Sequence, residues 1–205
     1  FFVINIMPYG INYFLHIFFE SDKLLLQNHL LKTAEASATH TERTTMGKYF
    51  GTDGFRGEAN VGLTADHAYK IGRFLGWYYG KDNPERARIV IGKDTRRSSY
   101  MFEYALAAGI TSSGSDAYLL HVTTTPSVSY VTRTDGFDCG VMISASHNPY
   151  YDNGIKLMNR EGEKMDEATI ALVEDYLDGK LEVDGSLWEE LPLAAGEEVG
   201  AVIDH

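Results

Sequence analysis

The chain has 205 residues, enough for one domain with its own core, and its 44% hydrophobic and 23% charged residues indicate a globular protein. Its formal net charge of −11 argues against a nucleic-acid binder, which must neutralise phosphates over a broad face. The single cysteine, Cys139, excludes an intrachain disulfide and favours a reducing compartment, so we expect a cytoplasmic protein.

The acidic residues are concentrated toward the C-terminal end. Residues 46–160 contain 13 Lys and Arg against 11 Asp and Glu, whereas residues 166–205 contain 12 acidic residues and only Lys180. Because the larger part of the chain is close to neutral, it can still offer a local basic pocket to a small anion. A phosphorylated small molecule is therefore compatible with this composition.

Residues 1–19 carry no Asp, Glu, Lys or Arg and are rich in Phe, Ile and Tyr, so a membrane segment has to be considered. The run is at the short limit for a span, contains a proline, a glycine and several polar residues, and lacks the basic leader of a secretory signal. We therefore expect no membrane association. A Ser/Thr-rich stretch then leads to Met46, which we expect to be the natural start, with residues 1–45 an extension outside the fold.

The regular pattern begins with Phe-Gly-Thr-Asp-Gly-Phe-Arg-Gly at residues 50–57. Three glycines beside Thr52 suit a backbone that approaches a ligand closely, and the Arg56 guanidinium can bind phosphate through two hydrogen bonds. Ordinary turns also use Gly and Asp, so this stretch alone is a weak signal.

A helix is predicted next, from the N-cap Thr64 to about Tyr79, because apolar residues recur along one face. Gly72 and Gly76 lie four residues apart in it. This spacing would let the helix pack close to a neighbouring element.

A short apolar strand is predicted at residues 88–91, and it ends in a second polar cluster, Gly-Lys-Asp-Thr-Arg-Arg at 92–97. Two interpretations are equally good here, a ligand-binding loop and a solvated loop that caps the next helix. That helix is predicted at about residues 99–113, with Gly114 as its C-terminal stop.

Another strand is predicted at residues 117–120. The helix after it would have Thr125 as its N-cap and Pro126 at its first position, and would end near Arg133. The apolar run at 140–143 then predicts a buried strand.

The loop Ile-Ser-Ala-Ser-His-Asn-Pro at residues 143–149 follows this strand directly. A loop at the carboxyl end of a parallel strand lies where α/β sheets bind ligands, so Ser146 is a candidate functional residue. The alternative is a polar turn closed by Asn148 and Pro149, because turn chemistry alone explains these residue types.

The remaining pattern predicts a strand at residues 154–158 and a last helix that begins at Asp166. The alternation of strands and helices predicts an α/β fold, a mostly parallel sheet flanked by helices on both faces. Beyond Gly179 no long periodic element is evident, and we expect residues 181–205 to be an acidic connector.

The polar clusters together resemble the α-D-phosphohexomutase family, in both order and spacing. The matching stretches are residues 50–57, 91–96, 125–126 and 143–156. The resemblance runs from about Lys48 to the end of the chain. Asp53 and the Ile-Ser-Ala that precedes Ser146 are similar to the phosphoglucosamine mutase branch. Four motifs in register are far more specific than any one of them.

The resemblance implies that Ser146 carries a phosphoryl group and exchanges it with a phosphorylated hexosamine through a 1,6-bisphosphate intermediate. It also implies that Lys156 and Arg56 supply positive charge, and that His147 orients the phosphoserine or moves a proton. Magnesium is the implied cofactor, bound to Ser146 through its phosphate.

Four further residues are implied to bind substrate or phosphate, or to support the residues that do. They are Asn148, Thr52, Asp94 and Arg96. For Asn148, turn formation is an equally good explanation.

Full-length members of the family have four domains, and their Asp-Gly-Asp-x-Asp-Arg metal loop, their sugar loop and their distal phosphate loop are absent from these 205 residues. We therefore expect residues 46–180 to be the first domain, residues 181–205 to lead toward a missing second domain, and the fragment to be inactive alone. Two alternatives stay open: a phosphomannomutase or phosphoglucomutase, and a non-catalytic module that binds phosphosugars.

Overall fold

The fold was analysed in a computed structural model. The structure describes residues 47–183, 185–188 and 190–205. The predictions for residues 1–45 lie outside the described residues. Within the described ranges, none of the helices is both long and apolar enough to cross a membrane.

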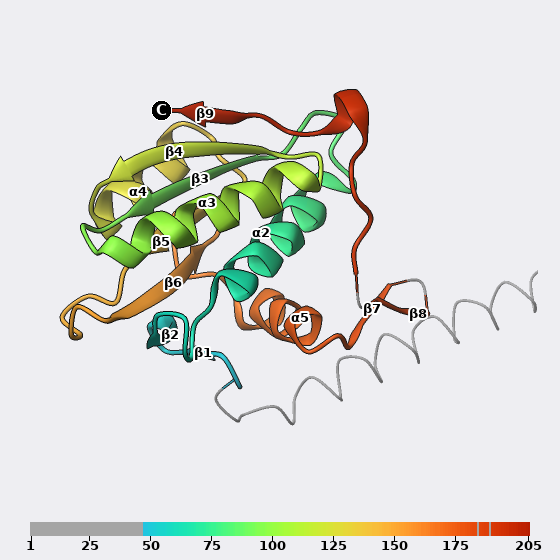
Figure 1. Cartoon of the computed structure of the whole chain (residues 1–205). Helices are drawn as coiled ribbons and strands as arrows, with labels where there is room; N and C mark the ends of the chain where they lie inside the picture. Colours follow the sequence, from blue (N-terminus) through green and yellow to red (C-terminus); the bar gives the residue numbers. More distant parts are fainter. Residues whose placement is uncertain (1–46, 184, 189) are drawn as a thin grey trace, which may run out of the picture. The chain divides into compact units, whose positions relative to one another are not determined.

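A seven-stranded sheet forms the centre of the described domain (Figure 1), and its strands lie in the order β1-β2-β6-β5-β3-β4-β9. In chain order they are β1 (Phe50–Gly51), β2 (Gly54–Glu58), β3 (Arg88–Lys93), β4 (Asp116–Val122), β5 (Cys139–Ile143), β6 (Asp152–Met158) and β9 (Val202–Asp204). Strand β3 pairs in parallel with β4 and β5, and β4 pairs in parallel with β9. Strands β6 and β1 run the other way, so the predicted mostly parallel sheet is confirmed.

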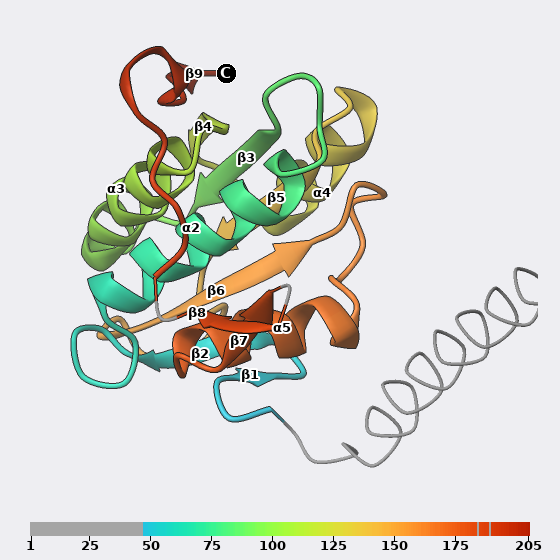
Figure 2. The same cartoon turned by 90° about the vertical axis from the view of Figure 1, so that its right-hand side faces the viewer.

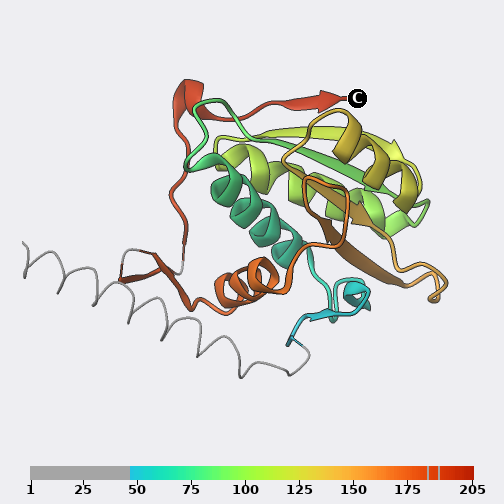
Figure 3. The same ribbon diagram turned by 180° about the vertical axis from the view of Figure 1, so that it is seen from behind.

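Helices cover both faces of the sheet, as predicted. They are α2 (Ala65–Gly80), α3 (Arg97–Ser112), α4 (Thr125–Thr134) and α5 (Glu167–Leu177). Helices α2, α3 and α5 contribute to one hydrophobic core and α4 to a second, smaller one. Figures 1 and 3 show the sheet from its two sides, and Figure 2 shows α2 and α3 side by side.

Successive side chains of β3 point to opposite faces of the sheet, and this alternation explains why the domain has two cores. Ile89 and Ile91 point into the larger core, whereas Val90 between them packs with Val128 of α4 and with Phe137. The strand is apolar on both sides because helices cover both sides of it. Its carboxyl end is therefore the first place where it can present polar groups to solvent.

Helices α2 and α3 approach each other closely through glycines, as the spacing of Gly72 and Gly76 predicted. A Cβ atom on Gly72 would lie 2.3 Å from the Leu106 carbonyl oxygen, and one on Gly109 would lie 2.2 Å from the Tyr69 carbonyl oxygen. Only glycine permits such contact between the two backbones.

Two predicted helix starts are wrong by one or two residues. Helix α4 is capped by Thr124, whose side chain accepts a hydrogen bond from the Ser127 amide, so Thr125 is its first residue and not its cap. Adjacent threonines make this position ambiguous in the sequence. Helix α3 begins at Arg97 rather than at Ser99, and its N-cap makes no side-chain hydrogen bond that could have marked it.

The sequence analysis found no long periodic element after Gly179, and it did not predict the short strands of this segment. Strands β7 (Leu181–Val183) and β8 (Ser186–Trp188) form a hairpin, and β9 extends the main sheet beside β4. Strands of three residues are too short to show a period of two. That this segment leads toward a second domain stays a prediction.

Candidate functional site

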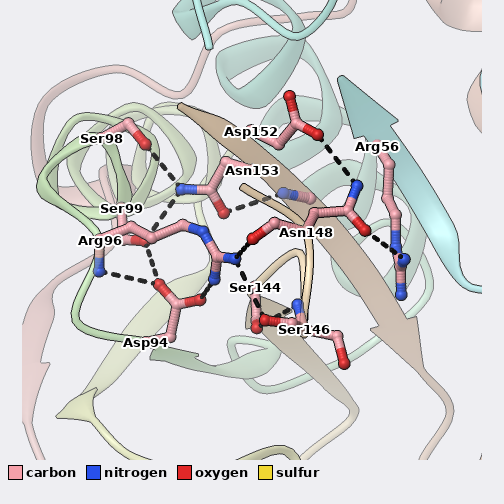
Figure 4. A network of polar contacts seen from close by, with 11 residues as sticks. Arg56, Asp94, Arg96, Ser98, Ser99, Ser144, Ser146, Asn148, Asp152 and Asn153 are labelled. Atoms are coloured by element: carbon pink, nitrogen blue, oxygen red, sulfur yellow. Dashed lines mark hydrogen bonds and ion pairs between the residues drawn. The ribbon is translucent and has the colours of Figure 1, made fainter. Parts of the chain in front are cut away.

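Two loops meet at the carboxyl ends of the parallel strands β3 and β5. The Asp94 amide, just after β3, donates a hydrogen bond of 3.0 Å to the Ile143 carbonyl at the end of β5. Because neighbouring parallel strands end at one edge of the sheet, the polar residues that follow each strand come together. Figure 4 shows the resulting network.

Ser146 lies exposed in the second of these loops, with a backbone φ of 57°. This value lies in the left-handed region, which L-residues other than glycine rarely adopt. The Ser146 amide donates a hydrogen bond of 3.0 Å to Ser144 Oγ. The Ser146 hydroxyl makes no hydrogen bond with any other described residue, so it is free to carry a group.

Arg96 connects the two loops. Its Nη2 atom donates hydrogen bonds to the Ser146 carbonyl at 3.1 Å and to the Asn148 carbonyl at 2.8 Å. Its Nη1 atom forms an ion pair with Asp94. The cluster at 92–97 is therefore more than a solvated loop, because it binds the backbone on both sides of His147.

The Asp94 carboxylate is the acceptor at the centre of this network. It accepts hydrogen bonds from the Arg96 amide at 3.0 Å and from the Ser99 hydroxyl at 2.8 Å. Burial alone would raise the pKa of Asp94, but these hydrogen bonds, the Ser144 hydroxyl and the Arg96 charge lower that pKa below its ordinary value. Asp94 is thus an anion at neutral pH.

Arg56 reaches the same loop from β2. Its Nη1 atom donates a 3.2 Å hydrogen bond to Asn148 Oδ1, and its Nη2 atom forms a 3.2 Å ion pair with Asp53. The Asn148 side chain also donates to Asp152 at 3.0 Å, while its amide closes a turn by donating to the Ala145 carbonyl. Asn148 therefore forms the turn and also orients Arg56.

Lys156 lies on the same side of the sheet as Arg56. Arg56 pairs directly with Gly154 across β2 and β6, and Lys156 follows Gly154 by two residues. Lys156 is half-buried and makes no ion pair within the part of the chain that the structure describes. Its charge is therefore available to an anion at this edge.

The structure does not connect the two other predicted residues to this network. His147 and Thr52 are both exposed, and neither makes a hydrogen bond or ion pair with another residue of the described ranges. Their roles stay predictions.

The sequence analysis did not identify Ser144, Ser99 or Asn153 as part of the site. Asn153 is buried, and its side-chain amide donates hydrogen bonds of 2.9 Å to both the Ser98 and the Ser99 hydroxyl. An asparagine next to the apolar run of β6 was the available signal, because a buried amide needs polar partners. The partners themselves follow only from the fold.

Residues 47–183 match the family described as "Phosphoglucomutase/phosphomannomutase, alpha/beta/alpha domain I". The chain belongs to this family. The phosphoglucosamine mutase of Lachnospira eligens is 69% identical to it over 161 residues, and that of Lachnoclostridium phytofermentans is 64% identical over 160 residues. Each match covers 78% of this chain and 34% of the relative, so the chain spans about a third of the length of these proteins.

A crystal structure of a phosphoglucomutase/phosphomannomutase family protein from Burkholderia thailandensis has the same fold. It superposes with a TM-score of 0.59 at 22% sequence identity, covering 78% of this chain and 34% of that one. The α/β architecture of domain I in the phosphoglucomutase/phosphomannomutase family is thus shown by a solved structure as well as by sequence.

Magnesium, the expected cofactor, does not fit the described residues alone. Among them, no group of three or more His, Cys, Asp or Glu side chains could hold a metal ion. Magnesium requires near-octahedral oxygen coordination. Domain I of this phosphoglucomutase/phosphomannomutase family member therefore lacks a complete set of protein ligands for the ion.

Proposed function

We propose that the chain forms the first domain of a phosphoglucosamine mutase, which interconverts glucosamine 6-phosphate and glucosamine 1-phosphate. The observation that carries the proposal is the exposed Ser146 hydroxyl, in a loop held at the carboxyl edge of the sheet, with Arg56 bound to the same loop. Relatives that bear this name at 69% and 64% identity support the choice of substrate.

In this proposal Ser146 carries a phosphoryl group on Oγ. The Oγ–P bond breaks as a hydroxyl oxygen of glucosamine 6-phosphate bonds to phosphorus, and the proton of that hydroxyl moves to Oγ. The 1,6-bisphosphate then transfers its 6-phosphoryl group back to Ser146: the O6–P bond breaks as Oγ bonds to phosphorus, the Oγ proton moves to O6, and glucosamine 1-phosphate leaves. An unactivated serine suffices because phosphoryl transfer depends mainly on alignment and charge neutralisation.

The neighbouring residues supply the alignment and the charge neutralisation that phosphoryl transfer needs. Arg56 and Lys156 place positive charge on one side of the sheet, beside the path of the phosphoryl group. Asn148 fixes the direction of the Arg56 guanidinium. His147, next to Ser146 in the chain, carries the proton between the sugar hydroxyl and Oγ.

We place the remaining parts of the site outside this chain. Magnesium would neutralise charge at the phosphate of Ser146, with its protein ligands on a longer polypeptide that also supplies the groups for sugar recognition. The 205-residue chain alone is accordingly expected to have no mutase activity.

A chimaera tests the proposal. Residues 47–205 would replace the matching segment of the Lachnospira eligens protein, and turnover of glucosamine 6-phosphate would be measured. We expect turnover in this chimaera and its loss in Ser146→Ala.

Ser186→Ala is the matched control, because Ser186 is exposed in β8 and makes no side-chain hydrogen bond with the loop among the described residues. Activity that survives Ser146→Ala would contradict the proposal.

A further inference from the structure

The backbone of Ser146 is held at both of its polar groups. Its amide donates to Ser144 Oγ at 3.0 Å, and its carbonyl accepts from Arg96 Nη2 at 3.1 Å. Among the described non-glycine residues, only Asn60, His121 and Ser146 have a positive φ. A residue in this sparsely populated region keeps its conformation only when its surroundings impose it.

Arg96 imposes the left-handed conformation by binding the Ser146 carbonyl, on the C-terminal side of this residue. One guanidinium nitrogen binds the carbonyls of Ser146 and Asn148, which flank His147, so the peptide units on both sides of the turn are fixed relative to each other. The side chain is largely buried, with 13% of its surface exposed. Lysine could not reproduce this arrangement, because it lacks the planar fork that binds two carbonyls and a carboxylate together.

Asp94 fixes Arg96 in turn. It pairs with the guanidinium, accepts the Arg96 amide, and is anchored to the end of β5 through its own amide and the Ile143 carbonyl. The Ser144 hydroxyl holds the Ser146 amide independently of this pair. The Ser146 backbone is therefore held on one side by Arg96, which Asp94 fixes, and on the other by Ser144.

We propose that Asp94 is the positioning residue of the loop, and that it acts through Arg96, alongside the Ser144 hydroxyl, to hold Ser146 in the left-handed conformation. In this conformation the Ser146 hydroxyl points away from the Asp94–Arg96 pair, as Figure 4 shows, and stays open to a reacting group. The role in reaction rests on the proposed function, whereas the role in loop conformation does not.

The conformational part is tested on the 205-residue chain by NMR. A residue with positive φ gives a strong cross-peak between its own amide and α protons, because the two protons are then close together. We expect a strong cross-peak for Ser146 in the native chain and a clearly weaker one in Asp94→Asn and in Arg96→Lys. Arg97→Lys is the matched control, since Arg97 is exposed and makes no hydrogen bond or ion pair with another described residue.

Ser144→Ala provides a milder variant in case Asp94→Asn does not fold, because it removes only the hydrogen bond to the Ser146 amide. It should weaken the same cross-peak. An unchanged Ser146 cross-peak in folded Arg96→Lys and Ser144→Ala would overturn the proposal.

The catalytic part is tested in the chimaera. Arg96→Lys should lower kcat on the order of a hundredfold with little change in KM, because a misplaced serine affects transfer more than binding. Equal kcat for Arg96→Lys and Arg97→Lys would overturn the catalytic role. Activity that survives Ser146→Ala would contradict the proposed function alone, because the NMR result for the loop does not depend on turnover.

Discussion

Arg56 and Arg96 contact the same loop in different ways. Arg96 binds two backbone carbonyls and is paired with Asp94, so its charge is used within the protein. Arg56 binds the Asn148 side chain, and its only ion-pair partner among the described residues is Asp53, whose side chain is 65% exposed. An exposed pair is weak, so the charge of Arg56 is the one available to a phosphoryl group.

Replacement of Arg56 should therefore affect reaction and not folding. In the chimaera we expect Arg56→Lys to lower kcat, because an ammonium group cannot bind Asn148 and a phosphate oxygen through a planar fork. We expect the midpoint of urea unfolding to stay unchanged. A large loss of stability with unchanged kcat would show that Arg56 has a structural role instead.

Asp94 should make stability depend on pH in the acid range. Its pKa in the folded chain is below the ordinary value of 3.8, since hydrogen bonds and Arg96 outweigh the effect of burial. The stability contributed by the ionised form is thus complete above about pH 4 and is lost as the pH falls through the folded-state pKa.

The measurement is the difference in free energy of unfolding between the native chain and Asp94→Asn, from neutral pH down to about pH 2. We expect this difference to shrink as the pH falls below the ordinary value of 3.8. A difference that grows toward acid pH would contradict the lowered pKa of Asp94.

At the scale of elements, a buried ion pair between β3 and α3 stabilises the strand end that leads into the site. Lys93, the last residue of β3, forms a 2.6 Å ion pair with Glu103 of α3, and both side chains have no exposed surface. His121 Nδ1 lies 3.6 Å from the other Glu103 carboxylate oxygen. This pair lies one residue before Asp94, so it fixes the end of the strand from which the loop emerges.

Removal of one partner of this pair should be costly. Glu103→Leu leaves the Lys93 charge buried and unpaired, and we expect a loss of about 3–5 kcal/mol in free energy of unfolding. The double variant Lys93→Met, Glu103→Leu should recover most of that loss, because apolar residues of similar volume replace both charges. Additive losses in urea unfolding would show that the two residues do not interact.

The contact between α2 and α3 predicts a second effect on stability. Alanine in a helix is intrinsically favoured over glycine by about 1 kcal/mol. At Gly72, however, the new Cβ would lie 2.3 Å from a backbone oxygen of α3, and overpacking of this kind costs about 1–3 kcal/mol.

We therefore expect Gly72→Ala to lower the thermal midpoint of the chain. Gly62→Ala is the control, because its Cβ would meet no atom closer than 3.6 Å. A rise in the midpoint for Gly72→Ala would show that the two helices can separate without cost.

At the scale of the whole molecule, the polarity of the sheet assembles the site. Strands β3 and β5 run in the same direction, so residues some fifty positions apart in the chain, such as Arg96 and Ser146, meet at one edge. The C-terminal segment adds β9 beyond β4 (Figure 1), and the buried Arg73 of α2 holds it by donating to the Leu191 and Pro192 carbonyls.

The sequence predicted the parts of the fold that have a clear period or a clear cap. Helix α2, capped by Thr64, and the apolar strand that leads to Ser146 are examples. The sequence did not predict β9. These three residues form a strand because they pair with β4, and such pairing cannot be read from the residue types alone. The sequence analysis also missed Asn153, since its partners lie on α3, more than fifty residues away in the chain. Ser144 was missed although its hydroxyl accepts from the amide only two residues further on.

The central claim is that Ser146 carries the phosphoryl group, and mass spectrometry of the Ser146 peptide tests it most directly. The chimaera would be isolated and treated with glucosamine 6-phosphate, and the phosphate on each serine peptide would be followed. We predict one phosphate on Ser146 that is lost transiently as glucosamine 1,6-bisphosphate forms and is regained as glucosamine 1-phosphate leaves. Formation of the bisphosphate by a chimaera whose phosphate is on another residue, with Ser146 unmodified throughout, would contradict the claim.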